Sequence, residues 1–120
     1  MSVIAAYIVP HPPMIIPQVG RGSEKQIQKT VAAYEQVADE IASLMPETIL
    51  ISSPHAILYG DYFHISPGKE ATGDFGSFRA KDVCFREKYD QELVKEITRI
   101  ASMKSFPAGT LGERDTKLDH

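Results

Sequence analysis

Two short apolar runs lie at either end of one long periodic segment in the first half of the chain. The runs are SVIAAYIV, at residues 2–9, and TILISS, at residues 48–53, and each is followed directly by a proline. Runs of this length, rich in β-branched residues and ended by proline, predict buried strands of a parallel sheet. A rigid loop without helix is expected over PHPPMIIPQVG, because its prolines remove backbone donors.

The segment between these runs predicts an amphipathic helix. It opens at Ser23, which has capping-box spacing with Gln26, and it ends before Pro46. Apolar residues recur along it at steps of three and four, as one stripe: Ile27, Val31, Tyr34, Ala38, Ile41 and Met45. Strand, helix and strand in this order form a βαβ unit with a right-handed crossover. We therefore expect an α/β fold, with a sheet flanked by helices in a three-layer-like arrangement.

The second half has weaker patterns. Residues 61–66 alternate and predict a third strand, residues 67–82 predict a long exposed loop, and residues 83–85 predict a short strand. Asp90 is placed to cap a second amphipathic helix that runs to about Ser105. We expect residues 1–120 to form a single domain.

Composition limits the classes of function. Of the 120 residues, 42% are hydrophobic and 24% charged, which is typical of a soluble globular chain. The net charge of −3 gives no basic stripe for nucleic acid, and no apolar run approaches the ~20 residues that span a bilayer. The N-terminus lacks a signal-peptide pattern and Cys84 is the single cysteine, so a cytoplasmic protein with a structural thiol is expected.

Two of the four histidines share a context. His11 and His55 each follow a proline, just past the carboxyl end of a predicted strand. Parallel strands place these ends on one side of the sheet, where ligands of open α/β sheets bind, so the two imidazoles are candidate metal ligands. The alternative for each is an ordinary surface histidine. His64 is interpreted as a partly exposed strand residue or a substrate-facing one, and His120, by position alone, as part of a frayed tail.

The motifs VPHPPMIIPQVG, ISSPHAILYGDYFHIS, GDFGSF, AGTLGERD and the closing LDH resemble the catalytic subunit of class III extradiol ring-cleavage dioxygenases. The similarity runs from residue 3 to residue 120 and is greatest to the Memo-like, AmmeMemoRadiSam-associated branch. Family members are longer, so the chain corresponds to the N-terminal portion of such a domain, an incomplete version of the extradiol dioxygenase fold.

The resemblance implies a chemistry. The family holds one Fe(II) with two histidines and one glutamate, and His11 and His55 match the two histidines. His120 matches a histidine that acts beside the substrate as an acid or base. Zn or Mn in place of Fe(II) stays open, and no third ligand is identified in this chain. A small aromatic diol is the implied substrate, and a homo-oligomer is expected because the absent strands would leave apolar surface uncovered.

Two other functions stay open. One is a non-catalytic Memo-like protein-binding module, which the unidentified third ligand favours. The other is a metal-dependent hydrolase that uses the same two histidines with zinc. Because family members supply their glutamate from a later part of the chain, we expect the 120-residue chain by itself to be weakly active or inactive.

Overall fold

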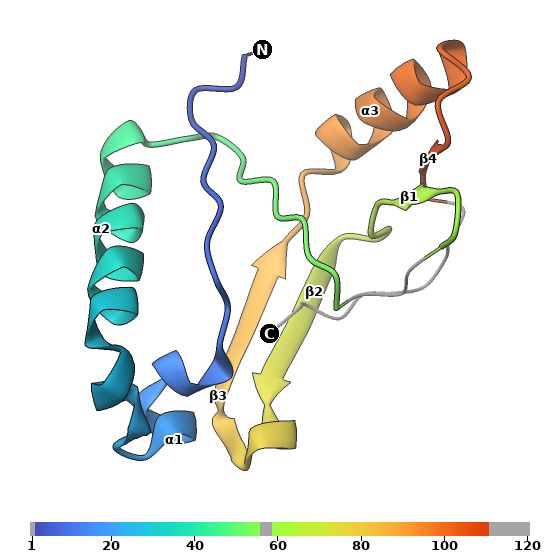
Figure 1. Ribbon diagram of the computed structural model, residues 1–120. Helices are drawn as coiled ribbons and strands as arrows, with labels where there is room; N and C mark the ends of the chain where they lie inside the picture. The colour runs from blue at the N-terminus through green and yellow to red at the C-terminus, as the bar shows by residue number, and fades with distance from the viewer. Residues whose placement is uncertain (1, 56–58, 111–120) are drawn as a thin grey trace. The chain divides into compact units, whose positions relative to one another are not determined.

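The chain divides into two compact units (Figure 1). The computed structural model describes residues 2–55 and 59–110. One unit comprises Met1–Leu50 and Phe75–Val83, and the other comprises Ile51–Asp74 and Cys84–His120. Both helices and small sheets are present, so the predicted α/β class is confirmed. No helix within the described ranges has the length and apolar character that crossing a membrane requires.

The N-terminal segment, residues 2–9, belongs to the first unit and is not a strand, although its sequence predicts one. Residues 48–53 likewise contain no strand, so the predicted βαβ pairing is wrong for the structure as described. A parallel strand needs ladder partners along its edges and cover on both faces. Here the segment runs as an unpaired trace beside α2 (Figure 1), and Val3 and Ile8 are 83% and 104% exposed.

The proline-rich loop contains helical turns, so the prediction of a loop without helix is wrong. A 3-10 turn covers Pro13–Ile15 and a one-turn helix, α1, covers Pro17–Gly20, each with proline in its first positions. Proline is tolerated there because the first backbone donors of a helix have no internal partner. Gly20 permits close packing of these turns, since a Cβ at this position would lie 2.5 Å from the backbone oxygen of Met14.

The long helix of the first unit, α2, covers Gln28–Leu44 and follows a 3-10 turn at Ser23–Ile27. The predicted Ser23 cap is wrong: no side-chain cap bond forms there, and the Glu24 carboxylate instead accepts a 2.7 Å hydrogen bond from the Gly22 backbone. The helix ends as predicted, with Met45 in the left-handed conformation directly before Pro46. Its half-buried stripe includes Val37 in place of the expected Ala38.

A β-hairpin replaces most of the loop predicted over residues 67–82. Its strands are β2 (Glu70–Phe75) and β3 (Ala80–Lys88), joined by a 3-10 turn at Gly76–Phe78. Ala71 and Phe75 are buried while the residues between them alternate outward, which is strand periodicity. The glycines and charges between these apolar positions conceal the alternation in the sequence. The strand predicted at residues 83–85 is confirmed within β3.

The second unit contains α3 (Gln91–Met103) and a short parallel pair, β1 (Phe63–His64) with β4 (Ala108–Gly109). The predicted second helix is confirmed together with its cap, because the Asp90 side chain accepts a 2.9 Å hydrogen bond from the Leu93 backbone. The third predicted strand forms, but only over two residues. The Phe63 ring stacks on Phe106 with centroids 5.5 Å apart, which packs the outer side of this strand pair.

Candidate functional site

His11 lies in the first unit, where the proline-rich loop leaves the N-terminal segment. Its imidazole is exposed. The backbone oxygen of Pro10, the preceding residue, accepts a hydrogen bond from the Tyr34 hydroxyl of α2. Burial raises the pKa of that hydroxyl above its ordinary value, which keeps it a donor at neutral pH. The helix therefore fixes the backbone immediately before the candidate ligand.

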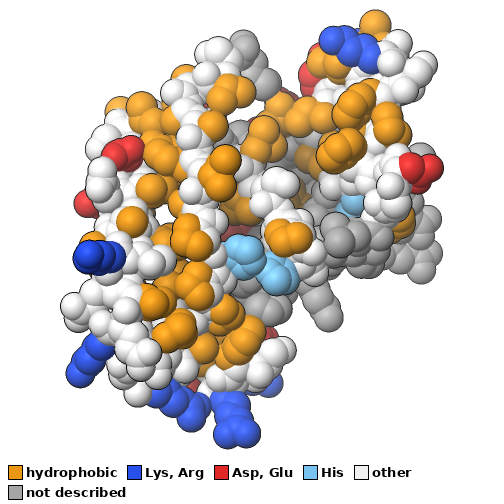
Figure 2. Space-filling view, in the orientation of Figure 1, with side chains coloured by type: hydrophobic (Ala, Val, Ile, Leu, Met, Phe, Trp, Pro, Cys, Tyr) orange, Lys and Arg blue, Asp and Glu red, His pale blue; other side chains and the backbone are white. Residues whose placement is uncertain are grey.

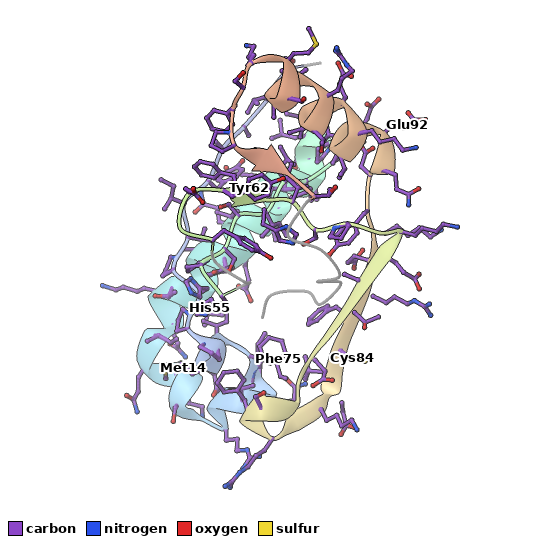
Figure 3. All side chains as sticks on the ribbon, turned by 90° about the vertical axis from the view of Figure 1, so that its right-hand side faces the viewer. Met14, His55, Tyr62, Phe75, Cys84 and Glu92 are labelled. Carbon is purple, nitrogen blue, oxygen red and sulfur yellow. The ribbon has the colours of Figure 1, made fainter. Side chains whose placement is uncertain are left out.

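His55 lies in the second unit and is also exposed. Its backbone N–H donates to the Ser53 hydroxyl at 3.2 Å, a local turn of the kind that serine forms next to proline. In this way the serine before Pro54 shapes the loop that carries the second candidate ligand. Figure 3 labels His55 among the side chains.

The predicted metal site is divided between these units. His11 belongs to one unit and His55 to the other, so their convergence on one metal ion stays a prediction. His120, the predicted acid or base, lies outside the described residues. Among the residues that are described, no group of three or more His, Cys, Asp and Glu side chains is arranged to hold a metal ion. Imidazole nitrogen is a ligand type that Fe(II), Zn and Mn all accept, so the two exposed side chains have the donor chemistry that two positions of a three-residue metal site require.

An aromatic cluster around His64 was only partly foreseen. The predicted alternation holds over residues 61–64, since Tyr62 and His64 are half-buried and Phe63 between them is 66% exposed, and it ends at Ile65, which is half-buried as well. The Tyr59 ring lies 5.6 Å from the His64 ring and 6.1 Å from the Tyr62 ring, in edge-to-face contacts. Tyr62 lies beside the short strand pair (Figure 3). No pattern in the sequence singles out Tyr59.

The two ring nitrogens of His64 are enclosed, and neither has a hydrogen-bond partner among the described residues. A buried polar group without a partner costs about 1–3 kcal/mol. The aromatic cluster thus combines a buried imidazole with two phenol rings in the second unit. Two of its members precede β1 in the chain and the third, His64, belongs to β1.

An open groove lies between the N-terminal segment and α2 in the first unit. It encloses about 810 Å³, with Ile4 and Ala5 on one side and three carboxylates of the helix, Glu35, Asp39 and Glu40, on the other. The Tyr7 hydroxyl donates to Glu40 at 3.1 Å, and burial, followed by that bond, raises the pKa of the tyrosine. Figure 2 shows hydrophobic side chains at the surface along this segment and beside α2.

Comparison with known proteins gives the class. The family profile described as the catalytic LigB subunit of aromatic ring-opening dioxygenase matches residues 5–120. The chain therefore belongs to this family. A protein of Clostridium acetobutylicum, whose name states no activity, is 38% identical over 108 residues. The aligned part covers 90% of this chain but 23% of that protein, so the chain spans about a quarter of its relative's length. No solved structure matches.

Proposed function

We propose that this chain supplies two of the three protein ligands of a non-haem Fe(II) centre for extradiol cleavage of catechol-type rings, in a protein of the Memo-like branch. The observation that carries the proposal is the family match over residues 5–120, which includes both Pro-His loops. The third ligand, a carboxylate, comes from outside the described residues. Fe(II) with open positions provides the family's oxygen and ring-opening chemistry when it is bound.

The residues of this chain have distinct roles in the proposal. His11 and His55 bind the metal through neutral imidazole nitrogens. Tyr34 holds the Pro10 backbone and Ser53 holds the His55 backbone, so each loop is positioned by a hydrogen bond from its own unit. His120 takes or delivers a proton beside the bound ring.

Metal binding separates this proposal from its alternatives. The 120-residue chain is titrated anaerobically with Fe(II), and in parallel with Mn(II) and Zn(II), by isothermal calorimetry. His11→Ala and His55→Ala should each weaken binding more than the roughly 10- to 100-fold that loss of an outer-shell partner costs. His64→Ala is the matched control and should bind metal like the unmodified chain, because His64 is not a proposed ligand.

Activity is tested in a longer protein that contains this segment with its natural continuation. Fe(II)-loaded enzyme should consume O₂ and give coloured ring-cleavage product from catechol, and His11→Ala and His55→Ala should abolish both signals. Metal binding unaffected by either substitution would contradict the ligand assignment. Metal binding without O₂ uptake, together with a retained protein partner, would favour the non-catalytic module. Turnover of an ester or amide with Zn(II) alone would favour a hydrolase.

A further inference from the structure

The N-terminal segment, defined as residues 3–9, has an unused strand edge. Within the described residues it has no ladder hydrogen bond, and no backbone–backbone hydrogen bond reaches it. Its apolar side chains face solvent at Val3 (83% exposed), Ile4 (57%) and Ile8 (104%). Unpaired backbone groups beside exposed β-branched side chains are the features of an edge that accepts another strand.

The sequence of this segment is nearly palindromic. Read in either direction, VIAAYIV places valine at both ends, isoleucine next, and small or aromatic residues in the middle. If two copies pair antiparallel about a two-fold axis at Ala6, Val3 meets Val9, Ile4 meets Ile8 and Ala5 meets Tyr7. Every cross-strand pair is then apolar, and each Tyr7 ring faces a small residue rather than a second ring. Such a contact stops at two copies, because each copy uses the same surface to bind the other.

Nothing in the segment opposes this pairing. Residues 2–9 contain no charged side chain and no proline, the two devices that most often protect an edge from association. The segment is also held in place in its own copy, through the Tyr7 bond to Glu40 and the Tyr34 bond to Pro10. An edge that is already ordered loses less conformational entropy when it pairs.

The large side chains of the segment are all more than a third exposed. Val3, Ile4 and Ile8 are more than half exposed, and Tyr7 and Val9 are 37% and 38% exposed. A contact of seven residues in each copy is small beside the roughly 20–30 residues a side of a standard interface, so a weak dimer is expected. From these observations we infer that the chain forms a two-fold symmetric dimer by antiparallel pairing of residues 3–9, with a dissociation constant in the micromolar range.

Sedimentation velocity tests the dimer on the unmodified 120-residue chain, from about 1 to about 100 μM. The chain should pass from monomer to dimer over this range. Ile8→Lys should weaken the dimer at least tenfold, because it places a charge in each of the two Ile4–Ile8 contacts. The matched control is Ile51→Lys, since Ile51 is 81% exposed and lies outside the segment. It should leave association unchanged, and circular dichroism checks that both variants are folded.

Disulfide trapping tests the register with milder substitutions in a Cys84→Ser background, which removes the exposed native thiol. Residues directly opposite in an antiparallel pair have Cα atoms about 4.5–5.5 Å apart, within disulfide reach. Ala6→Cys should therefore give a covalent dimer on mild oxidation, and Ile8→Cys should not. A mixture of Ile4→Cys and Ile8→Cys chains should link with each other.

Three results would overturn the inference. A chain that stays monomeric at all concentrations would show that copies do not pair, so a strand that covers this edge would have to come from another polypeptide. Equal weakening by Ile8→Lys and Ile51→Lys would place the contact elsewhere. Efficient linking of Ile8→Cys chains to themselves would indicate parallel pairing in register rather than the two-fold arrangement.

Discussion

Glu70 and Arg86 form an ion pair across the β2–β3 hairpin, in the part of it that belongs to the second unit. Two guanidinium nitrogens donate to the two carboxylate oxygens, one of them at 3.2 Å. That hydrogen bonding is the largest cause of a lowered pKa for Glu70 and of a raised pKa for Arg86. Both side chains are largely in solvent, at 43% and 70% exposed, so water and salt screen the pair.

Glu70→Gln should flatten the dependence of stability on acid pH. Because the folded pKa of Glu70 is lowered, its contribution is present above the unfolded value of about 4.3 and is lost as pH falls toward the folded value. Between pH 7 and pH 3 the variant should therefore lose slightly less free energy of unfolding than the unmodified chain, as measured by urea denaturation.

The matched control is Glu87→Gln, which removes a carboxylate from the same strand as Arg86. It should show the acid sensitivity of the unmodified chain. Raising the salt concentration should shrink the difference between Glu70→Gln and the unmodified chain, since the pair is exposed. Identical acid sensitivity in Glu70→Gln and Glu87→Gln would show that the ion pair does not contribute.

At the same residue scale, the candidate ligands could be found from sequence while their surroundings could not. His11 and His55 are conspicuous because each repeats the same local pattern, an apolar run followed by Pro-His. The Tyr59 ring contacts the His64 ring, and His64 is itself paired with Gly109, 45 positions away in the sequence. Residue patterns provide candidate ligands, whereas the neighbours of a buried ring can be named only once the fold is known.

Helices and strands also differ in how well the sequence predicts them. The helix α3 was predicted with its cap because all its signals are local: Asp90 precedes it and apolar residues recur at helical spacing along Gln91–Met103. The N-terminal segment has equally clear strand propensity but is not a strand. A strand exists only when another strand supplies hydrogen bonds, and among the described residues none does so for residues 2–9.

The short pair of β1 and β4 depends on a glycine. Gly109 pairs with His64 and has a φ of +150°, which side chains rarely adopt. An added Cβ would lie 2.8 Å from the Tyr62 hydroxyl oxygen and 3.1 Å from the Thr98 Cγ2. Both the backbone and the space around it therefore favour glycine at this position.

Gly109→Ala should destabilise the chain by about 1–3 kcal/mol, the usual cost of a strained backbone conformation. The free energy of unfolding is measured by urea denaturation. Gly60→Ala is the matched control, since no atom of the described residues lies within 4 Å of its added Cβ, and it should change stability little. Adding Tyr62→Phe to Gly109→Ala should recover part of the loss by removing the hydroxyl oxygen. Equal losses for Gly60→Ala and Gly109→Ala would contradict this account of β4.

At the scale of the whole molecule, the chain exposes much of the apolar surface that its sequence marks for burial. The four residues that form its buried hydrophobic core, within the described ranges, are Ala71, Phe75, Ala80 and Ala101. Large apolar side chains of the predicted strands, such as Ile8 and Ile51, are exposed instead. A core of this size leaves little stability to spare, because hydrophobic burial must offset the conformational entropy of the ordered chain. Any association that covers these side chains should therefore stabilise the fold.

Because association would cover exposed apolar side chains, stability and amide protection should depend on chain concentration. If residues 3–9 pair between copies, each tenfold rise in concentration well above the dissociation constant adds up to about 1.4 kcal/mol per dimer to the free energy of unfolding. Backbone amides of residues 3–9 should exchange rapidly in dilute solution, because no ladder covers them, and slowly at high concentration.

Hydrogen exchange followed by mass spectrometry at two concentrations separates this effect from general stabilisation. Amides of α3 already have hydrogen bonds within the helix, so their protection should rise only as far as global unfolding limits it. Ile8→Lys should remove the concentration dependence at residues 3–9 and leave α3 protected. Slow exchange of residues 3–9 at both concentrations would mean that a partner within the same chain covers the segment, and rapid exchange at both would mean that copies do not pair there.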